Sequence, residues 1–379
     1  MAARQDSPPL RLSYALTVAR FLCLLFLAGV AVAQQSTAPD LTAQIDRIAR
    51  EQMRKQHIPA MTVAVAEDGQ VIYSKGFGIA DIENNVAADA TTLIRTGSLA
   101  KPISAVAAMT LVEAGKLDLD APVQKYCPAF PQKPWPITTR ELLMHTSGIR
   151  HYKDDEIDIT KHYDSMSAGF AIFAADPLLF QPGTKFNYST YGYTVLGCVI
   201  EGASGERYYE YVREHVLLPA GMRHTFVDDH YAIVGHRAAG YQVKNGKMEN
   251  AGPMDSSYKI PGGGLVSTAE DYVRFGEALM EGKLVKAETL ALMWTPSLLP
   301  EFKNGKPAHY GMGFGVFTVD GQQVVGHSGG QQGTSTYMAF VPGKHFAVAV
   351  FANVEDVEPF DVVGPILNLY HMPNPHPKK

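Results

Sequence analysis

The chain has 379 residues, of which 46% are hydrophobic and 19% are charged. This composition excludes a largely disordered protein, and the length predicts either one large bipartite domain or two domains. The formal net charge of −5 gives no electrostatic reason to expect a nucleic-acid partner. A globular chain is therefore expected, and its oligomeric state cannot be read from these features.

The N-terminal segment has the pattern of a secretory signal. An uncharged apolar run covers residues 21–33, ends in Ala31-Val32-Ala33 and follows three arginines, Arg4, Arg11 and Arg20. Small residues before a cleavage point are typical of segments removed on export, and the run is shorter than the roughly 20 residues of a membrane span. A mitochondrial presequence is the alternative, because Asp6 is the only acid in this segment. The unbroken apolar run favours export, cleavage after Ala33 and a mature domain of residues 34–379 with no membrane span.

Hydrophobic spacing and turn residues predict the first elements of the mature chain. A helical pattern begins after Asp40. Two strand-like runs follow at residues 61–66 and 70–75, and the Asp-Gly pair at 68–69 between them is typical of a tight hairpin. An alanine-rich helical pattern then covers residues 99–114 and stops at a glycine.

The pattern changes in the middle of the chain and changes back near its end. Helical segments are predicted at residues 139–144, 193–201 and 208–216, between turns rich in proline and glycine. Strands return at residues 314–319, 323–326, 336–341 and 346–352, and a helix follows at 362–369. This order predicts an α/β fold of the α+β kind. Its single antiparallel sheet, flanked by helices, would use residues of about 40–105 and 255–379, with a mainly helical insertion at about 106–254.

Two cysteines remain after the expected cleavage, Cys127 and Cys198. Neither lies in a recognisable nucleophile motif with a histidine, so both are expected to be structural. An oxidising compartment would allow a disulfide between them, but a chain of this size does not need one. Their pairing therefore stays open.

Ser98 and Lys101 are the first candidates for chemistry, because they lie one helical turn apart on the same face. A serine hydroxyl needs an adjacent base, and a lysine can be that base if desolvation or a cationic neighbour lowers its pKa. The same spacing recurs at Ser256 and Lys259, so the motif alone is not specific. Ser98 opens a long helical pattern, whereas residues 261–264 are Pro-Gly-Gly-Gly and cannot sustain a helix. Context therefore selects Ser98 as the nucleophile.

Two later segments could complete a site around this serine. Tyr188 and Thr190 follow a Pro-Gly turn, and a tyrosine beside a lysine can move protons, since a nearby cation favours the phenolate. His327 starts a run with small residues, Ser328-Gly329-Gly330, on the strand that begins near residue 323. Small residues allow backbone to approach a substrate closely, and a backbone N–H can donate to an oxyanion.

Together, in this order, the three segments resemble the serine β-lactamases and penicillin-binding proteins. The chain is similar to the class C β-lactamase-related family over nearly all of residues 34–379, with further matches at residues 142–149 and 263–271. Within that family it is most similar to the serine β-lactamase-like branch of animal mitochondria. That similarity is carried by residues 113–120, 147–152 and 293–296.

The resemblance implies a β-lactamase/transpeptidase-like fold and an acyl-enzyme on Ser98, with Lys101 and Tyr188 handling protons. The N–H groups of Ser98 and Gly330 would form the oxyanion hole, and His327 would face Tyr188 and a substrate carboxylate. Because histidine titrates near neutrality, His327 is expected to add a pH dependence there.

One departure from the family pattern affects the expected substrate. Many relatives have asparagine where this chain has Thr190, and a hydroxyl cannot reproduce the donor and acceptor pair of an amide. We therefore expect a serine hydrolase of the peptidase or esterase type, acting on small peptides or esters and hydrolysing β-lactams poorly. A D,D-carboxypeptidase or D-aminopeptidase, a weak β-lactamase and a non-catalytic penicillin-binding-like receptor are the alternatives.

No metal site or cofactor is expected. His145 and His151 are not accompanied by a His-Glu-x-x-His motif or a carboxylate cluster. His145 is more consistent with a buried, hydrogen-bonded residue that braces its loop.

Overall fold

The computed structural model describes residues 40–376, apart from the side chains of residues 154 and 155. The expected signal at residues 1–33 lies outside the described residues. One compact unit contains the elements described below, and no helix in it is long and apolar enough to cross a bilayer.

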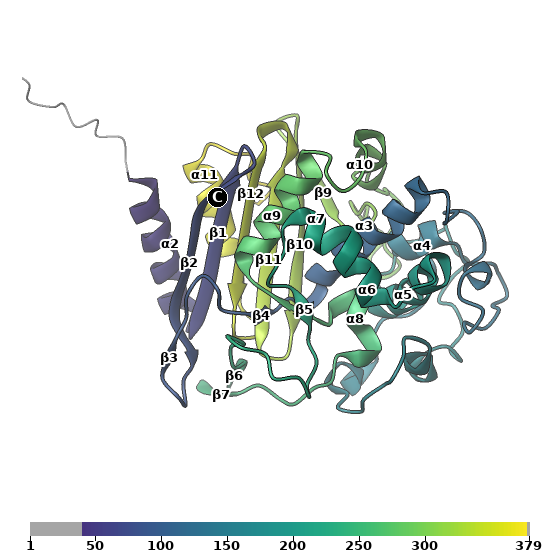
Figure 1. Cartoon of the computed structure of the whole chain (residues 1–379), viewed down its shortest axis with the longest axis horizontal. Coiled ribbons are helices and arrows are strands. Elements are labelled where there is room, and N and C mark those ends of the chain that lie inside the picture. The colour runs from purple at the N-terminus through teal and green to yellow at the C-terminus, as the bar shows by residue number, and fades with distance from the viewer. Residues whose placement is uncertain (1–39, 377–379) are drawn as a thin grey trace, which may run out of the picture. The chain divides into compact units, whose positions relative to one another are not determined.

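A seven-stranded antiparallel sheet joins the two ends of the chain (Figure 1). Its strand order is β3-β2-β1-β12-β11-β10-β9. The strands are β1 (Ala60–Glu67), β2 (Gln70–Asp81), β3 (Val86–Ala87), β9 (Gly315–Val319), β10 (Gln322–Gln331), β11 (Thr334–Val341) and β12 (Phe346–Ala352). N-terminal β1 pairs along its whole length with C-terminal β12, with Met61 opposite Ala352 and Glu67 opposite Phe346. The expected fold class and the sheet built from both chain ends are confirmed.

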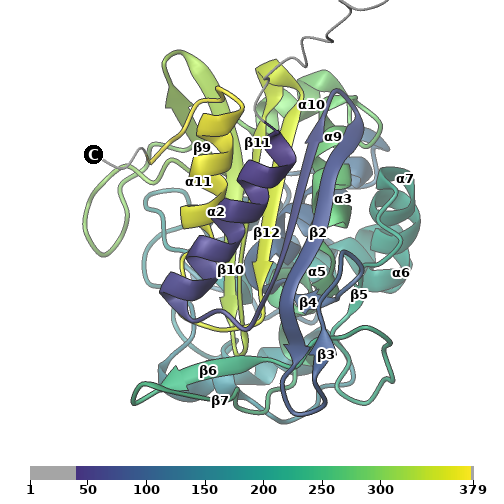
Figure 2. The same cartoon turned by 90° about the vertical axis from the view of Figure 1, so that its left-hand side faces the viewer.

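Helices cover both faces of this sheet. α2 (Leu41–Gln56) and α11 (Phe360–Leu369) pack on one face, and α9 (Ala269–Met280) packs on the other (Figure 2). Side chains of a strand alternate between the two faces, so Val63 and Val65 join the core under α2 and α11, whereas Ala64 and Ala66 join the larger core. Burial on both faces explains why β1 and β12 are continuous apolar runs rather than alternating ones.

A mainly helical part lies beside the sheet (Figure 1). Its helices are α3 (Ala100–Glu113), α4 (Thr139–Leu143), α5 (Thr190–Ser204), α6 (Tyr208–Val212), α7 (Leu218–Ala220), α8 (Ile260–Gly263) and α10 (Ala287–Met293). The expected insertion also contains strands that the sequence patterns did not predict. β5 (Phe226–Val227) forms a small sheet with β4 (Ile94–Arg95) and β8 (Leu265–Ser267), while β6 (Tyr241–Lys244) and β7 (Lys247–Asn250) form a hairpin. Short strands such as these carry too few residues to show a period.

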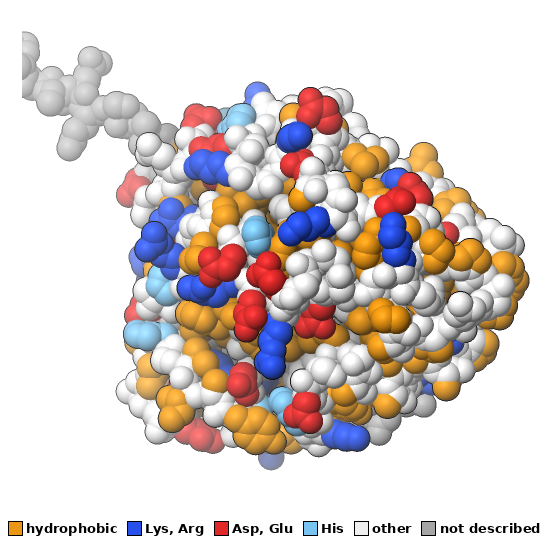
Figure 3. Space-filling view, turned by 45° about the vertical axis from the view of Figure 1, so that its right-hand side comes forward, with side chains coloured by type: hydrophobic (Ala, Val, Ile, Leu, Met, Phe, Trp, Pro, Cys, Tyr) orange, Lys and Arg blue, Asp and Glu red, His pale blue; other side chains and the backbone are white. Residues whose placement is uncertain are grey.

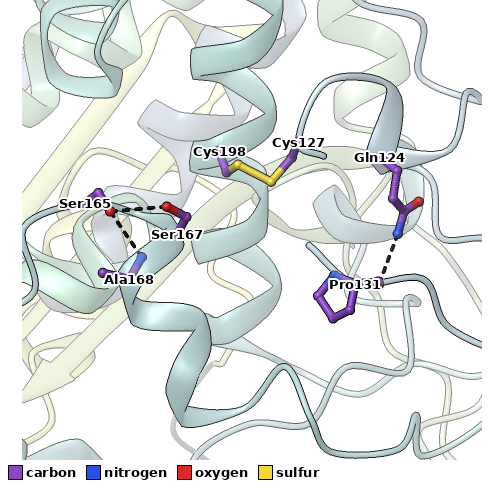
Figure 4. The surroundings of a disulfide bond; sticks show 7 residues. All are labelled: Gln124, Cys127, Pro131, Ser165, Ser167, Ala168 and Cys198. Carbon is purple, nitrogen blue, oxygen red and sulfur yellow. Dashed lines mark hydrogen bonds between the residues drawn. A yellow bond between two sulfur atoms is a disulfide. The ribbon is translucent and has the colours of Figure 1, made fainter. Parts of the chain in front are cut away.

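A disulfide joins Cys127 to Cys198 inside the helical part (Figure 4). Cys198 lies in α5, and Cys127 follows the short 3₁₀ helix Val123–Lys125. The bond closes a separation of 71 residues and ties this loop to the helix that begins with Thr190. Both cysteines therefore have the expected structural role, and the question of their pairing is answered by this disulfide.

Charged side chains of both signs are interspersed on the face shown in Figure 3. This distribution agrees with the small net charge of −5. No field of a single sign dominates that face.

Candidate active site

Ser98 lies in a 3₁₀ turn, Gly97–Leu99, that runs directly into α3. Gly97 has a φ of +52°, a conformation that a residue with a side chain rarely adopts. A Cβ at Gly97 would lie 2.8 Å from the backbone nitrogen of Gly330. The turn therefore presents the partly exposed Ser98 side chain while its backbone lies against strand β10.

Gly329 provides the other half of this close approach. A Cβ there would lie 2.2 Å from the Thr96 carbonyl oxygen, 2.3 Å from Thr336 Oγ1 and 3.2 Å from the backbone nitrogen of Ser98. Gly330, by contrast, has open space where a Cβ would be. The first glycine thus brings the strand against the nucleophile turn, and the second leaves room beside it.

Lys101 points from the first turn of α3 toward Ser98. Its Nζ lies 3.1 Å from Ser98 Oγ, 3.1 Å from Thr190 Oγ1 and 2.6 Å from the Gly262 carbonyl oxygen. The side chain is 0% exposed and none of these partners is a carboxylate. The predicted contact between the serine and the lysine is present in the structure.

The surroundings of Lys101 favour its neutral form. Burial lowers the pKa of Lys101 well below its usual value, and the positive charge of Lys259 lowers it further. The neutral amine has a free lone pair, so Lys101 is able to accept a proton from Ser98.

Tyr188 and Thr190 are held at the start of α5 by hydrogen bonds to neighbouring loops. Ser189 caps the helix by accepting from the backbone N–H of Gly192 at 3.0 Å. The N–H of Ser189 donates to His145 Nδ1 at 3.1 Å, and that of Thr190 donates to His151 Nδ1 at 3.2 Å. His145 is buried, which confirms its expected role as a brace of this loop. Sequence reasoning gave no such role to His151.

The ring of Tyr188 lies 4.8 Å from Lys101 Nζ. Burial raises the pKa of the Tyr188 hydroxyl above its usual value, and its interaction with the Ser98 hydroxyl opposes this only in part. The sequence argument that a nearby cation favours the phenolate is therefore outweighed by desolvation. Tyr188 is a phenol that can donate a proton, rather than a resting base.

His327 lies on β10, with its ring 6.2 Å from that of Tyr188. Its Nδ1 lies 2.5 Å from the Ser328 carbonyl, and its Nε2 lies 2.9 Å from the hydroxyl of Tyr310. Burial is the largest cause that lowers the pKa of His327, to about 3. The imidazole is therefore neutral, and the expectation that it titrates near neutrality is wrong because its burial was not visible in the sequence.

These side chains converge on one cleft of about 410 Å³. It is lined by Ser98, Tyr188, Tyr310, His327, Ser328 and Gly330, among others. Lys101 and Thr190 lie buried behind it, and Gly329 packs against the turn beneath it. All eight expected site residues are thus brought together. Tyr310 was missed, because a single tyrosine outside a motif carries no local signal.

The second Ser-x-x-Lys match does not form a nucleophile pair. Ser256 is 1% exposed, and its hydroxyl interacts with Asp228 Oδ2 at 3.4 Å. The following residues form the 3₁₀ turn Ser257–Lys259 and the four-residue helix α8, so the expectation that residues 261–264 cannot form a helix is wrong for residues 261–263. Among residues 40–376, no cluster of histidine, cysteine, aspartate and glutamate could hold a metal ion.

Comparison with known proteins agrees with this geometry. The family model described as "Beta-lactamase" matches residues 45–370. The chain belongs to the β-lactamase family. The structure of an octameric penicillin-binding protein homologue from Pyrococcus abyssi superposes with a TM-score of 0.75 at 29% identity, over 88% of this chain and 78% of that one. The resemblance seen in the sequence is confirmed, and the chain is a member of a family of β-lactamase-fold serine hydrolases.

Curated relatives of this β-lactamase-family chain come from animals and bacteria. The human serine β-lactamase-like protein LACTB, mitochondrial, is 30% identical over 75% of this chain and 69% of its own length. The putative penicillin-binding protein PbpX of Bacillus subtilis is 29% identical over 85% of this chain and 79% of its own length.

The expectation of export is contradicted by these relatives. The human, mouse and bovine proteins are all named as mitochondrial. The unbroken apolar run of residues 21–33 therefore does not by itself indicate export. Both kinds of targeting segment combine basic and apolar residues, so composition discriminates poorly between them.

Proposed function

We propose that this chain is a serine hydrolase that forms an acyl-enzyme on Ser98 and acts on small peptides or esters. The observation that carries the proposal is the 3.1 Å contact between Lys101 Nζ and Ser98 Oγ, made by a lysine with no exposed surface. Membership of the β-lactamase family supports the same reaction class.

In the acylation step Ser98 Oγ attacks the carbonyl carbon of the substrate while Lys101 takes the hydroxyl proton. The carbonyl oxygen becomes an oxyanion, to which the N–H groups of Ser98 and Gly330 donate. Tyr188 then donates its proton to the leaving amine or alcohol and recovers one from Lys101. The bond to the leaving group breaks, and the acyl group stays on Ser98.

Deacylation runs through the same groups in reverse. Water attacks the ester carbonyl, and its proton passes to Lys101 through Tyr188. Ser98 Oγ leaves and regains a proton from Lys101, which returns to its neutral form. The neutral His327 holds the Tyr310 hydroxyl at the rim of the cleft rather than taking part in this transfer.

The substrate class is inferred from Thr190. Its hydroxyl is occupied by Lys101 Nζ and offers a substrate no amide group. β-Lactams are therefore expected to acylate Ser98 and to form an acyl-enzyme that is hydrolysed slowly. Linear peptides or short esters should turn over faster.

A fluorophosphonate probe, which labels activated serines, tests the proposal directly. The wild type should be labelled on Ser98, and Ser98→Ala should lose labelling together with about 10⁶-fold in turnover. Ser256→Ala is the matched control and should keep both, because Ser256 is buried and its hydroxyl contacts Asp228, the ion-pair partner of Arg95, rather than a lysine amine. Labelling that persists in Ser98→Ala would show that the nucleophile is assigned wrongly.

A hydrolysis screen then separates the candidate substrates. Peptides, D-amino-acid peptides, short esters and the chromogenic cephalosporin nitrocefin are compared, with Ser98→Ala as the blank. Nitrocefin hydrolysis faster than every peptide and ester would indicate a β-lactamase. Ligand binding without labelling or turnover would indicate a receptor.

A further inference from the structure

Lys259 is a second buried lysine close to the active site, and the mechanism above gives it no chemical step. It ends the 3₁₀ turn Ser257–Lys259, and α8 follows it directly. Gly262 in α8 supplies the carbonyl that accepts from Lys101 Nζ at 2.6 Å. One short segment therefore holds both a partner of Lys101 and a second lysine.

The ammonium group of Lys259 forms no hydrogen bond or ion pair with the residues that the structure describes. The side chain is only 1% exposed. Its Nζ lies over the rings of Tyr152 and Tyr258, 5.6 and 5.3 Å from their centroids. Among the side chains that the structure describes, no carboxylate, hydroxyl or carbonyl forms a hydrogen bond with it. A buried cation without a paired anion is costly, and stacking on two aromatic rings offsets this only in part.

The nearest charged groups on neighbouring elements leave the charge of Lys259 uncompensated. Arg95, Asp228 and Asp158 face it, and Arg95 forms an ion pair with Asp228 at 2.8 Å. Asp158 accepts a hydrogen bond from Gln332. Burial and the charge of Arg95 lower the pKa of Lys259 to about 8, with the two aspartates acting in the opposite direction. Lys259 is therefore still mostly protonated at neutral pH.

The other titratable groups around Lys101 are neutral at that pH. Burial lowers the pKa values of three histidines and raises those of two tyrosines: His145, His151, His327, Tyr188 and Tyr193. Lys259 is the charged group in the described surroundings whose field acts on Lys101. A like charge disfavours protonation of its neighbour, which is how adjacent cations activate catalytic lysines.

We propose that Lys259 is a positioning residue whose positive charge adds to the effect of burial and favours the neutral form of Lys101, which accepts the Ser98 proton. The inference rests on the proposed function, because it assigns Lys101 the role of base. Lys259 itself touches neither the substrate nor the reacting atoms. It acts through the electrostatic field in the dry interior, where a charge is screened far less than in water.

The test is the pH dependence of fluorophosphonate labelling of Ser98, measured from about pH 5 to 10 to span the lysine titrations. Below the pKa of Lys101 the labelling rate is proportional to the fraction of Lys101 that is neutral. The pH profile therefore has an acidic limb, on which the labelling rate rises with pH. Without the charge of Lys259 the pKa of Lys101 rises, so the acidic limb moves to higher pH. Lys259→Met should shift the acidic limb to higher pH by about one pH unit, so that the labelling rate at a given pH on the limb falls about tenfold. At pH values above the limb the rate should recover to that of the wild type.

Two further variants separate charge from shape. Lys259→Arg keeps the charge and should leave the acidic limb near its wild-type position. Lys116→Met removes an exposed lysine and should change nothing. Thermal unfolding is measured in parallel, and Lys259→Met should melt no lower than the wild type because an apolar group replaces an unpaired buried charge. Lys259→Gln, also uncharged, replaces the methionine variant if that variant does not fold.

The outcomes distinguish this inference from the proposed function. If wild-type Ser98 is not labelled at any pH, the proposed function and the inference both fail. If the wild type is labelled and the acidic limb of the folded uncharged variant coincides with that of the wild type, only the inference fails. A loss of rate at all pH values in both Lys259→Met and Lys259→Arg would show a purely structural role and would also overturn it.

Discussion

Substituting Gly329 by alanine perturbs the contact between strand β10 and the nucleophile turn. The added methyl group would lie 2.2 Å from the Thr96 carbonyl oxygen and 2.3 Å from Thr336 Oγ1. Ordinary van der Waals contact begins near 3.4 Å. The strand and the turn must therefore separate by about 1 Å, since backbone on one side and a buried side chain on the other leave no free space.

That separation moves the Gly330 N–H relative to Ser98. Misplacement of a catalytic group by about 1 Å lowers turnover on the order of 10²-fold, and overpacking of this kind destabilises a core by about 1–3 kcal/mol. We expect Gly329→Ala to show both effects, in fluorophosphonate labelling of Ser98 and in urea unfolding.

Gly330→Ala is the matched control on the next residue. Nothing lies within 4 Å of a Cβ at Gly330, and the backbone N–H is retained. Its urea unfolding should therefore stay close to that of the wild type. If Gly329→Ala unfolds at the same urea concentration as Gly330→Ala, the reasoning from the close approach of the strand is refuted.

Two further predictions concern stability. Replacing Cys127 and Cys198 by serine removes a cross-link over 71 residues. Because the unfolded chain gains conformational entropy, the free energy of unfolding should fall by about 4 kcal/mol. An unchanged urea midpoint would contradict this. The pKa of His327 is about 3 in the folded protein, below its ordinary value of 6.5, so the unfolded chain binds more protons between these values. Its contribution to stability is therefore present above about pH 6.5 and is lost as the pH falls toward 3. His327→Gln should lose less stability than the wild type between pH 7 and 4 in urea titrations, and an equal loss would show that His327 titrates normally.

Elements whose signal lies in neighbouring residues could be predicted from the amino-acid sequence. The hairpin at Asp68-Gly69 needs two residues with positive φ, and the structure gives them φ values of +50° and +79°. Apolar periodicity predicted β1, β12 and α3, because burial of a strand or helix face imposes a spacing on neighbouring residues. The three short motifs indicated the family for the same reason, since each is read within a few positions.

The electrostatics of the site depend on contacts between residues that are distant in the chain. Burial favours the neutral form of Lys101, and none of its three hydrogen-bond partners is a carboxylate. Burial also keeps His327 neutral, although the hydrogen bond with the Ser328 carbonyl acts in the opposite direction. Burial is set by residues distant in the chain, so no local pattern reports it. The second Ser-x-x-Lys segment illustrates the point: its serine faces Asp228. Its lysine, Lys259, influences the site only because folding places α8 beside α3, more than a hundred residues away along the chain.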